Sequence, residues 1–272
     1  MKDPFQACLQ LVIGASLLLC TVSCSETPQG VVKKNQAALN GTLDRLSALG
    51  ARFSDQPPGY DRISLPPNAP VLDVDDIGNY AYSGAANAQL FTVQDLLDPE
   101  AKTPLMHVFR SRAAWQDVRA MVKDARFAGP EQDALKALKG FAGWRYAVVI
   151  RARSVQAPRM LSQPVVGTVV DNRTFSTGSF AGGAIEGDVL LYDLESLAFL
   201  GGFPFSARSS DNVESTTYGD AAGAEGLQQW LDKDFADQIK KAVFIGLADQ
   251  MPKDRIFING NLRRRLETEK GK

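Results

Sequence analysis

The order of helix-like and strand-like segments predicts an α+β fold with a mostly antiparallel sheet. Helical periodicity comes first, at residues 35–49 and 111–140, strand periodicity follows at 144–205, and a long helical pattern occupies 227–247. Helices and strands segregated along a chain in this way are typical of an antiparallel sheet with helices packed against it. We expect a sheet that includes a hairpin and is covered on one face by helices, among them the long C-terminal helix.

The first helix is expected at residues 35–49, where Leu39, Leu43 and Leu46 recur at intervals of four and three residues. This spacing places the three leucines on one face of an amphipathic helix. Five prolines within residues 54–70 exclude a regular element there and predict an extended loop.

Two further helices are expected after residues 71–110, whose secondary structure the pattern leaves open. Ser111 is a suitable N-cap for the second helix, and Pro130 suits the first turn of the third. Gly140 can end the third helix. We expect these two helices to pack as a hairpin.

A half-buried strand is expected at residues 144–153. Apolar and aromatic side chains alternate there with arginines, and a period of two places the two sets on opposite faces of a sheet. The apolar set is Trp144, Tyr146, Val148, Ile150 and Ala152, and the arginines are Arg145, Arg151 and Arg153.

A β-hairpin is expected from residues 189–194 and 197–205, which are joined across Glu195 and Ser196. The adjacent glycines at 201 and 202 indicate a bulge or a close approach of two backbones. Weaker strand patterns occupy residues 165–170 and 174–180, on either side of an Asp-Asn turn signal.

The pattern divides the chain into four parts. Residues 1–23 are expected to be a signal peptide, and residues 24–34 to form the N-terminus and tether of the mature chain. Residues 35–250 are expected to form one α+β domain, because the chain is long enough to bury a core of that size. Residues 251–272 have the charge pattern of a solvated tail.

Composition and motifs exclude several functional classes. The 272 residues carry 30 Lys and Arg against 31 Asp and Glu, so no chain-wide basic field attracts nucleic acid. No nucleophile elbow, Walker A loop or dinucleotide fingerprint occurs. The lone histidine, His107, lies in an apolar run and is expected to be structural. We therefore expect no cofactor, no metal site and no catalytic residue of a recognised kind.

The N-terminal segment has the layout of a secretory signal. Its apolar core, Leu11 to Leu19, is shorter than the roughly 20 residues that a membrane span requires. All three cysteines of the chain, Cys8, Cys20 and Cys24, lie in this segment, so folding of the remainder cannot depend on disulfides.

Thr21, Val22, Ser23 and Cys24 resemble the lipobox of bacterial lipoproteins. The resemblance covers only residues 1–24, and it implies that Cys24 receives diacylglycerol before the signal peptide is removed. Ser25 at the next position implies sorting to the outer membrane, with the body facing the periplasm. An ordinary signal peptide or an uncleaved anchor are the alternatives.

The leading functional hypothesis is a lipid-anchored envelope protein that acts by binding, as an accessory or scaffold component. The expected partner is an envelope protein or polymer, and the candidate partner surface is formed by Trp144, Arg145, Arg151 and Arg153. A hydrolase of an envelope polymer that uses Asp or Glu side chains, and a carrier of an apolar ligand, are the alternatives.

Overall fold

The computed structural model describes residues 27–53, 62–74, 86–98, 111–124, 131–162, 165–170, 173–177, 179–211, 216–218 and 224–258. The predicted lipidation site Cys24, the lone His107 and the end of the predicted tail lie outside these residues. No helix within the described ranges combines the length and the apolar character that crossing a bilayer requires.

The central element is a four-stranded mixed sheet in the order β2 (Ala88–Thr92), β3 (Tyr146–Gln156), β8 (Ala184–Asp193) and β9 (Phe199–Arg208). The β3–β8 and β8–β9 pairs are antiparallel, whereas β2 pairs with β3 in parallel. Three helices separate β2 from β3 along the chain, and a parallel pair requires a crossover of this kind. The α+β class is confirmed, and the expected antiparallel sheet gains one parallel edge strand.

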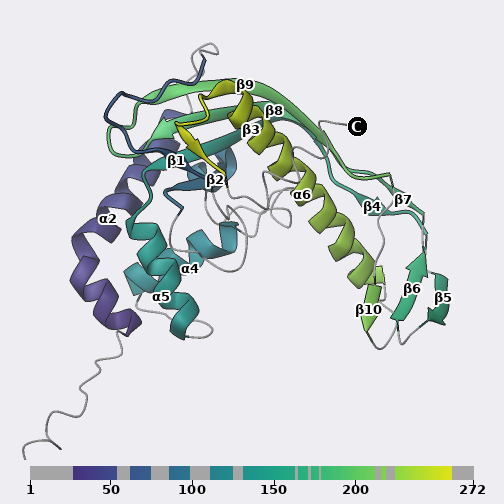
Figure 1. Cartoon of the computed structure of the whole chain (residues 1–272). Helices are drawn as coiled ribbons and strands as arrows, with labels where there is room; N and C mark the ends of the chain where they lie inside the picture. The colour runs from purple at the N-terminus through teal and green to yellow at the C-terminus, as the bar shows by residue number, and fades with distance from the viewer. Residues whose placement is uncertain are drawn as a thin grey trace, which may run out of the picture.

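Helix α6 (Ala224–Gln250) covers one face of the sheet, as expected of the long C-terminal helix. Its buried side chains Phe235, Ile239, Val243 and Leu247 form one core cluster with Tyr146, Val148 and Ile150 of β3. Figure 1 shows α6 running diagonally across the strands and on toward the far end of the sheet.

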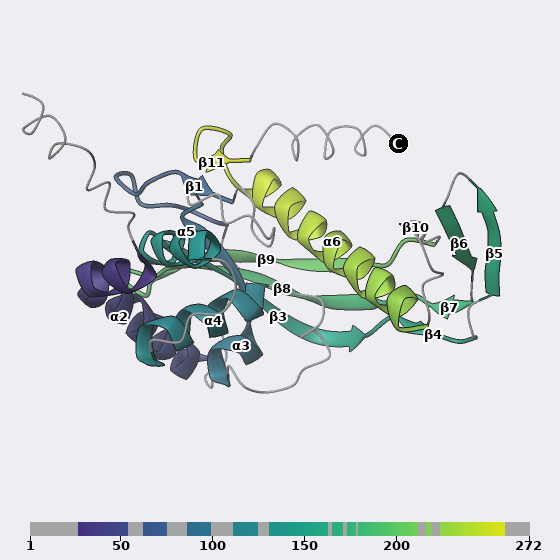
Figure 2. The ribbon, with the colours of Figure 1, turned by 90° about the horizontal axis from the view of Figure 1, so that it is seen from below.

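A second helical layer covers part of the opposite face. It consists of α2 (Pro28–Arg52), α3 (Val93–Leu97), α4 (Ser111–Asp124) and α5 (Glu131–Ala142), which share a second core cluster with Ala147 and Val149 of β3. Figure 2 shows α3 and α4 on the side of the strands that faces away from α6. The prediction that helices cover only one face therefore holds only for the part of the sheet that this second layer leaves uncovered.

The burial of β3 follows this two-layer arrangement. Residues 146–150 are buried on both faces, whereas residues 151–156 are partly or fully exposed. The first part of the strand is thus buried on both faces and only the second part is half-buried, whereas we expected a half-buried strand throughout. The continuous apolar run from Tyr146 to Ile150 is typical of a strand covered on both faces.

The expected helices are confirmed, but their limits differ from the predictions. Helix α5 continues through Gly140, which was expected to end it, to Ala142, and α6 extends beyond the expected residues 227–247 at both ends. Helix α4 begins at Ser111, and α5 follows Pro130 and contacts α4. Helix α2 begins at Pro28 instead of residue 35, because Thr27 caps it and proline suits its first turn. Its backbone is non-helical at Asn35, so the predicted boundary coincides with a kink.

The predicted hairpin is formed by β8 and β9, although β8 already begins at Ala184. The register shifts beside Gly201, whose φ of 122° is accessible to glycine, so the predicted bulge is confirmed. A Cβ at Gly202 would lie 2.6 Å from the Val189 carbonyl oxygen, which also confirms a close backbone approach.

Small sheets flank the central one. Strands β5 (Val165–Val170) and β6 (Arg173–Thr177) confirm the weaker strand patterns. They form a three-stranded sheet with β10 (Thr216–Tyr218), in the order β10-β6-β5, beyond the N-terminal end of α6 (Figure 1). Strands β4 (Arg159–Met160) and β7 (Phe180–Ala181) pair nearby.

Part of the predicted tail belongs to the domain. Strand β11 (Ile256–Phe257) pairs in parallel with β1 (Leu72–Asp73), and Met251, Ile256 and Ile258 are buried. Their apolar side chains extend the core, so the domain continues past the predicted limit at residue 250 to at least Ile258.

Candidate binding site

Two of the predicted surface arginines are held by one buried carboxylate. Arg151 donates to Asp188 Oδ2 from Nε at 2.9 Å and from Nη2 at 2.6 Å, and the Asp188 side chain is fully buried. Arg153 Nη2 lies 3.6 Å from the other carboxylate oxygen and 3.4 Å from the Gly187 carbonyl oxygen. A bulge between Ala152 and Ser154 leaves Arg153 as the extra residue, which allows both arginines to reach one partner.

Arg145 is engaged at the other end of the sheet. Its Nη2 lies 2.7 Å from Asp193 Oδ2, and its Nη1 pairs with Glu195. The second carboxylate oxygen of Asp193 accepts the backbone N–H of Glu195 at 2.8 Å. Arg145 therefore stabilises the turn of the β8–β9 hairpin through Asp193 and Glu195.

Tyr146, the neighbour of Arg145, is buried at the same end of the sheet and donates its hydroxyl to the Pro70 carbonyl oxygen at 2.6 Å. Burial raises the pKa of Tyr146; the charge of Asp193 adds to this effect, and the charges of Arg145 and Arg255 oppose it.

Trp144 is a core residue, which corrects the prediction that it belongs to a partner surface. It is 5 % exposed and packs edge-on against Phe141 and Phe91, with ring centroids 4.7 Å and 5.8 Å away. Of the four predicted surface residues, only Arg153 has a side chain that is more than half exposed, at 57 %. The structure therefore does not bring the four together as one open surface.

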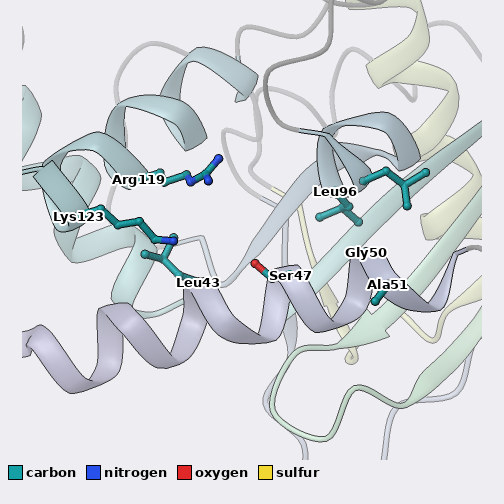
Figure 3. Close-up of a pocket in the computed structure, with 8 residues that line it drawn as sticks. Leu43, Ser47, Gly50, Ala51, Leu96, Arg119 and Lys123 are labelled. Carbon is teal, nitrogen blue, oxygen red and sulfur yellow. The ribbon is translucent and has the colours of Figure 1, made fainter.

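A hollow of about 270 Å³ lies between three helices (Figure 3). Helix α2 contributes four of its lining residues, α3 two, and α4 two. They are Leu43, Ser47, Gly50 and Ala51, then Leu96 and Leu97, then Arg119 and Lys123.

Helical spacing explains how α2 and α4 line the hollow. Leu43, Ser47, Gly50 and Ala51 follow one another at steps of four, three and one, and Arg119 and Lys123 are four apart, so each set shares a helix face. Figure 3 shows Lys123 reaching from α4 toward α2 near Leu43, while Arg119 extends from α4 alongside α2.

The closed end of the hollow is a tight contact between α2 and α3. A Cβ at Gly50 would lie 2.3 Å from the Leu96 carbonyl oxygen, so only glycine permits this approach. Leu43 and Leu96 are buried and form an apolar floor. The rim is accessible, because Ser47 and Lys123 are exposed and Leu97 is 48 % exposed.

The electrostatics of the hollow are one-sided. Among the described residues, its lining contains two cations and no Asp or Glu. Within the described part of the chain, neither Arg119 nor Lys123 forms an ion pair, and Ser47 is not hydrogen-bonded to either of them. This arrangement can hold a carboxylate or phosphate beside an apolar group, but it offers no activated nucleophile.

Sequence reasoning assigned Leu43 to a core stripe and missed Arg119, Lys123 and Ser47. The spacing of four residues places Arg119 and Lys123 on one face of the predicted helix, where like charges repel each other, but this spacing alone does not indicate a site. The position of α3, which closes the hollow, had one signal that sequence reasoning missed: Thr92 and Asp95 form a capping box, and this spacing is typical of a helix N-terminus.

No group of three or more His, Cys, Asp or Glu side chains is placed to hold a metal ion within the described ranges. Comparison of the sequence with models of known protein families gives no match, and comparison with curated proteins gives none at a significant level.

Proposed function

We propose that this chain is a lipid-anchored protein of the bacterial outer membrane, facing the periplasm, that acts by binding as an accessory or scaffold component. The anchor is Cys24, and α2 is capped by Thr27 only three residues later. A fully extended connection of this length spans at most about 11 Å. Such a tether would hold the start of α2 close to the bilayer surface.

The hollow between α2, α3 and α4 is the observation that supports binding. It combines an apolar floor with the two cations Arg119 and Lys123, which have no ion-pair partner among the described residues. A glycoside hydrolase needs two facing carboxylates, and a carrier needs an enclosed apolar cavity. The part of the lining that the structure describes holds no carboxylate and its rim is exposed, so the hollow favours the binding function over both alternatives.

Site-specific photo-crosslinking in intact cells tests this function. A benzophenone amino acid replaces Leu97 at the rim of the hollow, or Leu161 as a control. The two leucines are 48 % and 58 % exposed but belong to different elements, since Leu97 ends α3 and Leu161 directly follows β4. We expect a reproducible adduct from position 97 and none of the same mass from position 161. The adduct should disappear when Arg119 and Lys123 are both replaced by Glu.

Two results would contradict the proposal. Equal labelling from both positions would indicate random encounters, and the absence of any adduct from position 97 would remove the hollow as a binding site. Adducts that persist in the double Glu variant would show that its cations do not select the partner.

A further inference from the structure

We infer that the hollow between α2, α3 and α4 receives the C-terminal end of a partner polypeptide, with a free α-carboxylate and an apolar last side chain. This inference rests on the proposed binding function and names the chemistry of the bound group. It is carried by the joint placement of Arg119, Lys123, Ser47 and the apolar floor.

The requirement for an anion comes from the cation pair on α4. Arg119 and Lys123 are one helical turn apart on the same face, a spacing at which like charges repel. No acid among the described lining residues offsets them. A carboxylate placed between them would accept charge-assisted hydrogen bonds from both and remove this repulsion.

The requirement for an adjacent apolar group comes from the floor. Leu43 is 3 % and Leu96 is 6 % exposed, and both line the hollow beneath the cations. Leu97, at 48 % exposure, adds an apolar contact at the rim. A bound molecule must therefore carry its charge next to an apolar side chain.

The size of the hollow indicates that it holds only the end of a chain. Its volume of about 270 Å³ falls just below the range of roughly 300–1,000 Å³ that is typical of sites for whole small molecules. Its exposed rim leaves a path by which the rest of a polypeptide can continue into solvent. Capture of a C-terminal carboxylate is a known mode of peptide recognition.

A free fatty acid carries the same carboxylate as a peptide C-terminus, but its acyl chain fits the shape of the hollow less well. A long acyl chain needs an enclosed apolar channel to leave water. The floor of the hollow ends where Gly50 packs against the Leu96 backbone, at a separation that excludes even a methyl group. Ser47 adds a hydroxyl on the rim, which can bond to a carboxylate oxygen or a peptide N–H.

Peptide binding to the full-length lipidated protein in neutral-lipid nanodiscs tests the inference. The probe is a fluorescein-labelled peptide, Gly-Ser-Gly-Ser-Ala-Val-Leu, prepared with a free C-terminal carboxylate or with a C-terminal amide. Fluorescence anisotropy should show saturable binding of the acid and at least about tenfold weaker binding of the amide, because the amide cannot form charge-assisted hydrogen bonds.

Variants locate the binding to the hollow. Arg119→Gln and Lys123→Gln should each weaken binding of the acid peptide by about fivefold to tenfold. Ser47→Phe should abolish binding by filling the hollow while both cations remain. Lys136→Gln removes an exposed lysine of α5 outside the lining and should bind like the wild type. Thermal unfolding of each variant confirms that it is folded.

Equal binding of the acid and amide peptides would overturn the inference, as would wild-type affinity in the Arg119 and Lys123 variants. Tighter binding of sodium decanoate than of the peptide would overturn it in favour of a fatty acid. Binding of inorganic phosphate with the affinity of the peptide would show that charge alone is recognised, which also contradicts it. If the crosslink from position 97 persists in cells while the peptide fails, only the ligand class is wrong and the binding function stands.

Discussion

Arg151 and Asp188 face each other directly across the β3–β8 register, and two nitrogens of the guanidinium contact one oxygen of a carboxylate that has no exposed surface. The pair lies where the second helical layer ends and the sheet face becomes exposed. Asp188 therefore holds the arginines of β3 against the sheet at this transition.

Removal of the Asp188 carboxylate should destabilise the fold. Asp188→Asn leaves Arg151 and Arg153 without their anion, and breaking a buried pair is strongly destabilising. Arg151 is 30 % exposed and can partly rehydrate, so we expect a loss of about 2–3 kcal/mol in the free energy of unfolding, measured by urea denaturation.

Glu186→Gln is the matched control for this substitution. Glu186 is an exposed carboxylate two residues away on the same strand, so its replacement should change stability by less than about 0.5 kcal/mol. Similar effects of the two substitutions would contradict a special role for Asp188.

Alanine substitutions at two helix glycines should change the free energy of unfolding in opposite directions. A Cβ at Gly246 of α6 would lie 2.0 Å from Cε2 of Phe203, a buried ring of β9 that has little room to move. Overpacking should outweigh the better helix propensity of alanine and lower stability by about 1–2 kcal/mol. At Gly41 of α2 the nearest atom is the end of the flexible Arg45 side chain at 3.7 Å, so Gly41→Ala should stabilise by up to about 1 kcal/mol.

Thermal and chemical unfolding of the two glycine variants measure this difference. A stabilising Gly246→Ala would show that α6 does not approach β9 as closely as the structure describes.

Stability should decrease at alkaline pH because of Tyr146. Burial raises the pKa of Tyr146 above its ordinary value of 10.0, so the unfolded chain loses this proton at a lower pH than the folded chain. The contribution of this shift to the free energy of unfolding is complete below pH 10. It is lost as the pH rises from 10 through the raised pKa of Tyr146 in the folded chain. Urea unfolding between pH 8 and pH 11 should show this decline.

Tyr146→Phe isolates the contribution of that hydroxyl. The variant loses the hydrogen bond to Pro70 and should be less stable at pH 8, but its stability should decrease less steeply above pH 10. Burial also raises the pKa of Tyr192, so part of the decline should remain. Parallel pH profiles for the wild type and the variant would contradict the assignment to Tyr146.

The anchor leads to a prediction about processing. Cys24→Ala should either release the protein from the membrane fraction or make the unprocessed form accumulate, because the acyl chains have no attachment site. Cys20→Ala serves as the control, because Leu19 before Cys20 is a bulky residue and Leu17 to Cys20 therefore resemble the lipobox less well than Thr21 to Cys24. Fractionation and mass spectrometry of the N-terminus measure the outcome, and an unmodified Cys24 would refute lipidation.

Local periodicity was sufficient for most elements. The signals that located them all lie between residues close in the sequence. They are the apolar stripe of α6, the N-cap expected at Ser111, the strand patterns and the adjacent glycines at 201 and 202. They predicted the α+β class because helix and strand patterns depend on neighbours within a few positions. The parallel strand β2 and helix α3 fell in the stretch that the pattern left open.

The placement of charged and aromatic side chains could not be predicted in the same way. The period of two located Arg145, Arg151 and Arg153 correctly as a polar set, but their partners Asp193 and Asp188 lie on another strand. Trp144 fits the pattern of either face, and only the packing of Phe141 and Phe91 against it makes it a core residue.

The amino-acid sequence alone determined the class of fold, the main helices, the hairpin and its bulge, because these depend on short-range spacing and backbone preference. Only the tertiary structure decided which arginines are held by buried carboxylates, and where a cationic hollow forms. Both features join segments that are distant in the sequence: β3 with β8, and α2 with α3 and α4. Their juxtaposition depends on packing around two cores, which no local pattern encodes.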